Sequence, residues 1–190
     1  MSRSPEIIEI LAEVVEKTAL GCSLVVMDGK GGWKTISCPK INYTFGNAQY
    51  VKDSLDVLSK PVIYTMKFPL IALFCPFNEQ RKSPEYYTKA KVRVLIACST
   101  SREWNNEQRL HTSFVNILRP IYNRFLEALK EDGRFDFGYD EHVSHEYSEN
   151  YSYGRYGAFT STGEAVSEPI DAINITNLEL KVKNPNCRLQ

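Results

Sequence analysis

Residues 68–77 (FPLIALFCPF) are apolar at every position over the length of one β-strand. A strand with one wet face alternates apolar and polar side chains, so a continuously apolar strand must be covered on both faces. A second segment of this kind, residues 91–100 (KVRVLIACST), places apolar side chains on both faces as well. One face would carry Val92, Val94, Ile96 and Cys98, and the other Leu95 and Ala97. These two strands predict a sheet with other parts of the chain packed on both sides.

Two amphipathic helices are predicted to pack on this sheet. The first has Ser4 as its N-cap, Pro5 at its first position, an apolar stripe from Ile7 to Val15, and Gly21 at its end. The second begins at residue 105 or 106 and ends at Gly133. Proline removes a helical hydrogen bond, so Pro120 predicts either a kink or two helices, the second opened by Pro120. Apolar residues recur in this helix at Leu110, Phe114, Ile117, Ile121, Phe125 and Leu129.

The remaining elements are short. We expect a strand over residues 22–28, a turn at DGKGGW, extended chain over residues 34–45 and a weak helix over residues 50–59. A last strand, residues 171–183, has an apolar phase that slips by one position between Ile175 and Leu178, which predicts a β-bulge near Thr176 and Asn177. The sequence therefore predicts one α+β domain, residues 1–190, with a single mixed or antiparallel sheet flanked by the two helices.

Composition and charge exclude several classes of function. The 23 lysines and arginines balance 23 aspartates and glutamates, so no net positive field attracts nucleic acid. No apolar run approaches the ~18 residues of a membrane span, and the N-terminus has no signal-peptide pattern, so we expect a cytoplasmic chain without a membrane partner. The five cysteines are far apart and form no CxxC pair, which favours buried free thiols.

Candidate catalytic groups are few. The motif HVSHE has neither order of histidines and glutamate found in zinc enzymes, so surface histidines are favoured over a metal site. Asp171, Glu179 and Lys181 are similar to the Asp…Glu-x-Lys pattern of a nuclease superfamily, in which two carboxylates hold a divalent metal. Eight residues of continuous strand would separate the two carboxylates by about 26 Å, too far to share an ion. We expect no enzyme activity and no cofactor, and the metal-dependent nuclease is kept as the alternative.

A long Tyr-rich excursion over residues 134–168 has no helical or strand period. Tyrosine with serine, glycine and asparagine is typical of protein-binding loops. Two alternatives stay open: a loop folded onto its own domain, and a single-strand nucleic-acid binder, although the segment is acidic. The candidate interface residues are Tyr139, Tyr147, Tyr151, Tyr153, Arg155, Tyr156 and Phe159.

The order of the predicted elements resembles the tail terminator, or tail completion, proteins of long-tailed bacteriophages. The segments that carry this resemblance are SPEIIEILAEVVEK, SLVVMD, KFPLIALF, VRVLIAC, FVNILRPIYNRFLEALKE and INITNLELKV. The resemblance implies a virion protein that is assembled in the host cytoplasm and forms a ring, usually a hexamer, which caps the tail tube and faces the connector or adaptor proteins of the head. Another head-tail joining subunit of the neck is also compatible with it. Within such a ring, a second contact is expected at the loop NEQRKSPEYYTK through Arg81, Tyr86 and Tyr87.

Overall fold

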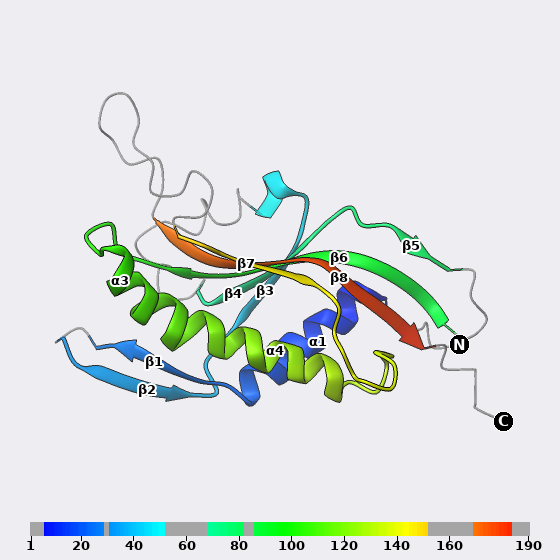
Figure 1. The fold of residues 1–190 in the computed structure, drawn as a ribbon, viewed down its shortest axis with the longest axis horizontal. Helices are drawn as coiled ribbons and strands as arrows, with labels where there is room; N and C mark the ends of the chain where they lie inside the picture. Colours follow the sequence, from blue (N-terminus) through cyan, green and yellow to red (C-terminus); the bar gives the residue numbers. More distant parts are fainter. Residues whose placement is uncertain (1–5, 29–30, 52–67, 82–85, 152–168, 184–190) are drawn as a thin grey trace.

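The computed structural model describes residues 6–28, 31–51, 68–81, 86–151 and 169–183 (Figure 1). The order of helices and strands along the chain is close to the predicted one. The elements are α1 (Ile7–Leu20), β1 (Ser23–Met27), β2 (Trp33–Ser37), β3 (Asn42–Gly46), β4 (Leu70–Phe74), β5 (Glu79–Gln80), β6 (Tyr86–Ser99), α3 (Asn106–Arg109), η2 (Leu110–Leu118), α4 (Arg119–Glu131), β7 (Glu146–Asn150) and β8 (Ile170–Lys183).

The main sheet has the strand order β3-β4-β6-β8-β7, with β5 also paired to β6. Strands β3 and β4 are parallel, and the other neighbours are antiparallel. The α+β class with a mixed sheet is therefore confirmed. Strands β1 and β2 pair with each other in a separate two-stranded sheet, which confirms the turn predicted between them.

One face of the main sheet carries the larger core. Helices α1 and α4, with η2, pack against it, and the fully buried Phe114, Ile121 and Phe125 lie there. Strand β4 is covered on both faces as predicted: Ile71 and Leu73 belong to this core, and its neighbouring side chains belong to a second one. The second core, on the opposite face, consists of Val51, Leu70, Ala72, Leu95, Ala97, Ile170 and Ala172. β6 occupies the middle of the sheet.

The predicted bulge in the last strand is confirmed. Val92 of β6 faces Leu178, whereas Val94 faces Ile175, so β8 contains one extra residue between these pairs. Asn177 has a φ of 53°, a left-handed conformation that asparagine tolerates better than most residues. The extra residue returns Leu178, Leu180 and Val182 to the helix-covered face.

Both helices differ from the predictions at their ends or in their interior. The N-cap of α1 is Glu6, because Ile7 is the first helical residue, and Ser4 and Pro5 lie outside the described residues. Gly21 ends α1 as predicted. The long helix is π-helical over η2, where the amide of Arg119 donates to the carbonyl of Phe114 five residues back. An α-helical part follows with Pro120 in its first turn, which is the second of the two predicted alternatives.

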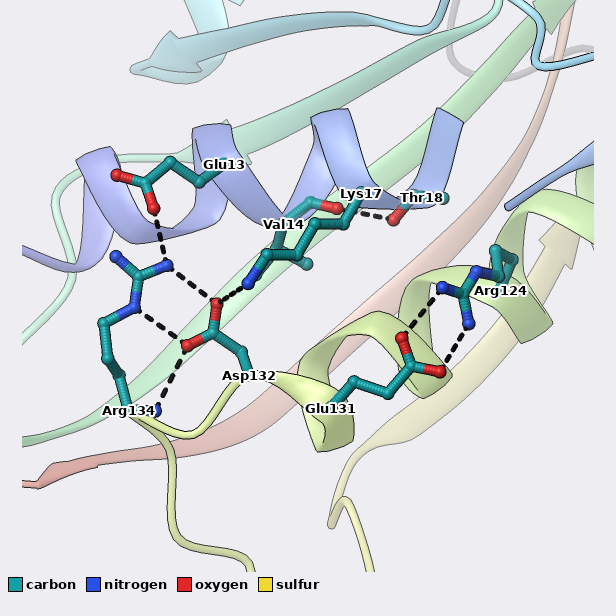
Figure 2. A network of polar contacts seen from close by, with 8 residues as sticks. All are labelled: Glu13, Val14, Lys17, Thr18, Arg124, Glu131, Asp132 and Arg134. Carbon is teal, nitrogen blue, oxygen red and sulfur yellow. Dashed lines mark hydrogen bonds and ion pairs between the residues drawn. The ribbon is translucent and has the colours of Figure 1, made fainter. Parts of the chain in front are cut away.

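A buried carboxylate joins the end of α4 to α1 (Figure 2). Asp132, 2% exposed, accepts hydrogen bonds from Lys17 Nζ at 2.7 Å and from Arg134 Nε at 2.8 Å. Arg134 also forms an ion pair with Glu13 of α1 at 2.7 Å. The side chain of Arg134, and then that of Lys17, hold the pKa of Asp132 far below its ordinary value. These contacts fix α1 and α4 against each other.

Two smaller predictions need correction or fall partly outside the structure. Cys22 and Cys98 are buried as expected, but Cys38 is exposed after β2, with a φ of 52° and its thiol donating to the carbonyl of Leu20. Of the predicted weak helix, residues 50 and 51 belong to a helical turn over residues 48–51, and the rest lies outside the described residues.

Candidate functional site

Part of the Tyr-rich excursion is a strand. β7 pairs antiparallel with β8 and, among the described strands, stands at one end of the main sheet (Figure 1). The expectation that residues 134–168 contain no regular structure is therefore wrong for this part. The reason lies in its composition: Glu146, Ser148 and Asn150 alternate with Tyr147 and Glu149, so neither face shows an apolar period. A polar edge strand gives no hydrophobic signal in the sequence.

Tyr147 is held on the outside of the domain by its neighbours. Its ring lies 4.8 Å from that of Tyr122 on α4, in an edge-to-face arrangement, and its hydroxyl donates to Glu149. Glu149 in turn accepts two hydrogen bonds from Arg119, at 2.7 Å from Nε and 3.1 Å from Nη2. Arg119 lowers the pKa of Glu149 through these bonds, and burial raises the pKa of Tyr147. Tyr147 is thus oriented by its contacts while 42% of it stays exposed.

His145 extends the same cluster. Its Nδ1 lies 2.6 Å from the carbonyl oxygen of Val143, and its Nε2 lies 2.7 Å from the hydroxyl of Tyr122. A carbonyl can only accept, so Nδ1 carries a proton, and in the neutral ring Nε2 accepts from Tyr122. His145 therefore contacts α4, while His142 is exposed. In the described part of the chain no group of three or more His, Cys, Asp or Glu residues could hold a metal ion.

The other predicted interface residues divide into three groups. Tyr151 stacks on the buried Phe114 with 4.4 Å between ring centroids, and 37% of it is exposed. Tyr139 lies on a separate turn at residues 138–141 and is fully exposed. The remaining four, Tyr153, Arg155, Tyr156 and Phe159, lie outside the described residues.

Arg81, Tyr86 and Tyr87 do not form one loop. Arg81 follows β5, whereas the two tyrosines begin β6. The guanidinium of Arg81 lies over the ring of Tyr87 at 5.6 Å, and the hydroxyl of Tyr86 donates to Asp136. Their contacts are thus within the domain. Tyr86 is paired with Lys183 of β8, and Tyr147 is paired with Ile175 of the same strand. These two positions on β8 are eight residues apart, so about 26 Å separates the two predicted contact regions.

The residues of the nuclease alternative are not brought together. Asp171 lies on the helix-covered face, is fully buried and forms an ion pair with Arg109 at 3.6 Å. Glu179 and Lys181 share the opposite face, as predicted, and Glu179 forms an ion pair with Lys91 at 2.8 Å. The bulge at Asn177 separates the two carboxylates onto opposite faces, so they cannot chelate one ion.

A groove that was not predicted from the sequence lies on the face of the sheet opposite the helices. It has a volume of about 730 Å³ and runs along β6 and β8. At one end Arg93 lies over the ring of Phe74 at 4.5 Å and donates to Asn174. At the other end Lys89 and Lys181 stand directly opposite each other. The sequence does indicate a charged outer face on these two strands, because charged residues alternate with apolar ones in KAKVR and ELKVK.

Comparison with known proteins finds no matching family model, no matching curated protein and no matching solved structure. Among the described residues, no helix combines the length and the apolar character needed to cross a membrane.

Proposed function

We propose that this chain is a non-enzymatic structural subunit of a bacteriophage virion, which forms a ring with copies of itself and caps or joins the tail tube at the neck. The observation that carries the proposal is the rigid display of aromatic rings at the β7 edge of the main sheet. Tyr147 is oriented by Tyr122 and Glu149, and Tyr151 by Phe114. Aromatic side chains that are ordered before binding lose little conformational entropy when they form a contact, as expected of a protein interface.

The position of β7 supports the same function. An edge strand offers backbone groups to a neighbouring chain, and a ring subunit needs complementary patches on two different flanks. The order of elements on which the resemblance to tail terminators rests, from α1 through β4 and β6 to the long helix and β8, is the order in the structure. The proposed partners are other copies of the chain, the tail tube protein and the head connector or adaptor proteins.

The first test is the mass of the purified chain by light scattering over a concentration series, with negative-stain images. Rings, or a monomer that forms rings as concentration rises, are the expected result. Purified tail tubes should bind the chain at their ends. A strict monomer that neither forms rings nor binds tubes would contradict the proposal.

Variants of the aromatic surface sharpen the test. Tyr147→Ser combined with Tyr151→Ser should weaken ring formation by about tenfold or more, because buried aromatic anchors dominate interface energies. Trp33→Ser is the matched control, since Trp33 is 54% exposed on the separate β1–β2 sheet. Equal loss in both variants would indicate an effect unrelated to β7.

A further inference from the structure

The groove on the sheet carries an excess of positive charge. Its lining contains four cationic side chains and one acidic one, Glu179, which is already paired with Lys91. Lys89 and Lys181 are directly opposite on neighbouring strands, and like charges in this position destabilise a sheet. An anionic group bound between them would relieve this repulsion. The cationic residues are Lys89, Lys91, Arg93 and Lys181.

The other end of the groove is apolar and aromatic. Phe74, Pro76 and Phe77 line it, with the guanidinium of Arg93 over the ring of Phe74. From Arg93 to Lys89 the strand spans about 13 Å. A short segment with an aromatic ring followed by carboxylates would match both ends.

The turn at residues 138–141 has this composition. Tyr139, Asp140 and Glu141 are consecutive and exposed, and Tyr139 is 102% exposed, so its ring occupies no groove of its own chain. The turn is held by local hydrogen bonds: Gly138 N donates to Asp136 Oδ1 at 2.9 Å, and Glu141 N donates to the carbonyl of Gly138 at 3.3 Å. It therefore presents the tyrosine in an ordered form.

We propose that the groove binds the turn at residues 138–141 of a second copy of this chain. The Tyr139 ring lies against the aromatic end, and Asp140 and Glu141 approach Lys89 and Lys181. Because this inference rests on the proposed self-association, it adds one pair of surfaces, beside the β7 edge, through which neighbouring subunits meet. A contact between two different patches of identical chains is the kind that builds rings.

Charge exchange tests the contact directly. One variant carries Asp140→Lys with Glu141→Lys, and the other carries Lys89→Glu with Lys181→Glu. The second variant keeps two like charges opposite each other. It also removes the attraction of Lys181 for Asp136 and Glu179 and the contact of Lys89 with the Tyr86 ring, so its thermal unfolding midpoint is measured beside that of the wild type. Each variant alone, measured by light scattering at low salt, should associate at least about tenfold more weakly. An equimolar mixture should recover association to within about threefold, because the lysine turn of one variant fits the glutamate groove of the other.

Two controls accompany the mixture. Lys34→Glu with Lys40→Glu reverses two exposed charges outside the groove and should leave association unchanged. Tyr139→Ser should weaken association by about tenfold with no change in the thermal unfolding midpoint. Raising the salt concentration should weaken the wild-type contact.

The outcomes separate this contact from the proposed function. If the wild type forms rings and the charge variants associate as strongly as the wild type, the groove contact is wrong. It is also wrong if the mixture of the two variants recovers no association. In both cases the proposed oligomeric ring is unaffected. If the wild type does not associate at any concentration, the groove contact is wrong, and if it also fails to bind tail tubes, the proposed function is wrong as well. If Lys89→Glu with Lys181→Glu abolishes binding of a single-stranded oligonucleotide and leaves association intact, the groove is a nucleic-acid site and the contact is again overturned.

Discussion

Lys17 and Asp132, 115 residues apart in the sequence, form a 2.7 Å ion pair that links α1 to the end of α4. A carboxylate at a helix C-terminus is unfavourable by itself, because the carbonyl end of a helix is negative. Arg134 offsets this charge by a second, two-point contact with the same carboxylate.

Asp132→Asn should therefore lower the free energy of unfolding by about 2 to 4 kcal/mol, since it leaves two cations facing a neutral buried amide. Lys17→Met is the control: Lys17 is 45% exposed, so its loss should cost less than about 1 kcal/mol. Urea unfolding of both variants measures this, and equal costs would contradict the assigned role of Asp132.

The same carboxylate predicts an acid dependence. Its pKa is depressed in the folded chain, so its contribution is complete above the ordinary value of 3.8 and is lost as pH falls toward the lower folded pKa. Between about pH 5 and pH 2, the unfolding free energy of the wild type should fall more steeply than that of Asp132→Asn. Parallel slopes would show that another group is responsible.

The pairing of Arg119 with Glu149 should control the order of β7. Arg119→Lys keeps the charge but cannot reproduce the two-point contact, so amide exchange in Glu146–Asn150 should speed up by about fivefold to tenfold. Arg124→Lys is the matched control, because Arg124 pairs with Glu127 and Glu131 of its own helix. Hydrogen exchange by mass spectrometry distinguishes the two, and faster exchange in both would remove the specific role of Arg119.

Deleting Asn177 should be tolerated. Without it, Ile175, Leu178 and Leu180 alternate regularly toward the core, and the register with β6 on either side of the bulge is preserved. The deletion variant should therefore unfold cooperatively. An alanine inserted between Leu178 and Glu179 should not, because it turns Glu179 and Lys181 inward. Circular dichroism during thermal unfolding checks both, and a molten deletion variant would contradict the prediction.

Asp171 and Glu179 should differ in how much they contribute to the stability of the fold. Asp171→Asn leaves the buried Arg109 without its 3.6 Å partner and should cost about 3 to 5 kcal/mol. Glu179→Gln should change stability by less than about 1 kcal/mol, because its pair with Lys91 is exposed. Neither the wild type nor Glu179→Gln should cleave DNA with magnesium. Metal-dependent cleavage that Glu179→Gln abolishes would restore the nuclease alternative.

The fold could largely be predicted because the burial of one face of a helix or strand produces a periodic pattern of apolar residues in the local sequence. The apolar stripe of α1, the two-sided apolar run of β4 and the slipped phase of β8 each record which face is covered. Much less of the candidate site could be predicted. Tyr147 and Tyr151 were identified from composition, but β7, which positions Tyr147, has no apolar face and therefore no period.

What the sequence determined by itself is the set of elements and the side of each that is buried, because these depend on residues within a few positions of one another. Only the tertiary structure decided which charges meet: the register that places Lys89 opposite Lys181, and the turn of the chain that brings Asp132 to Lys17. These relationships join residues distant in the chain, and electrostatic energy depends on distance in space, for which the order of residues along the chain carries no local signal.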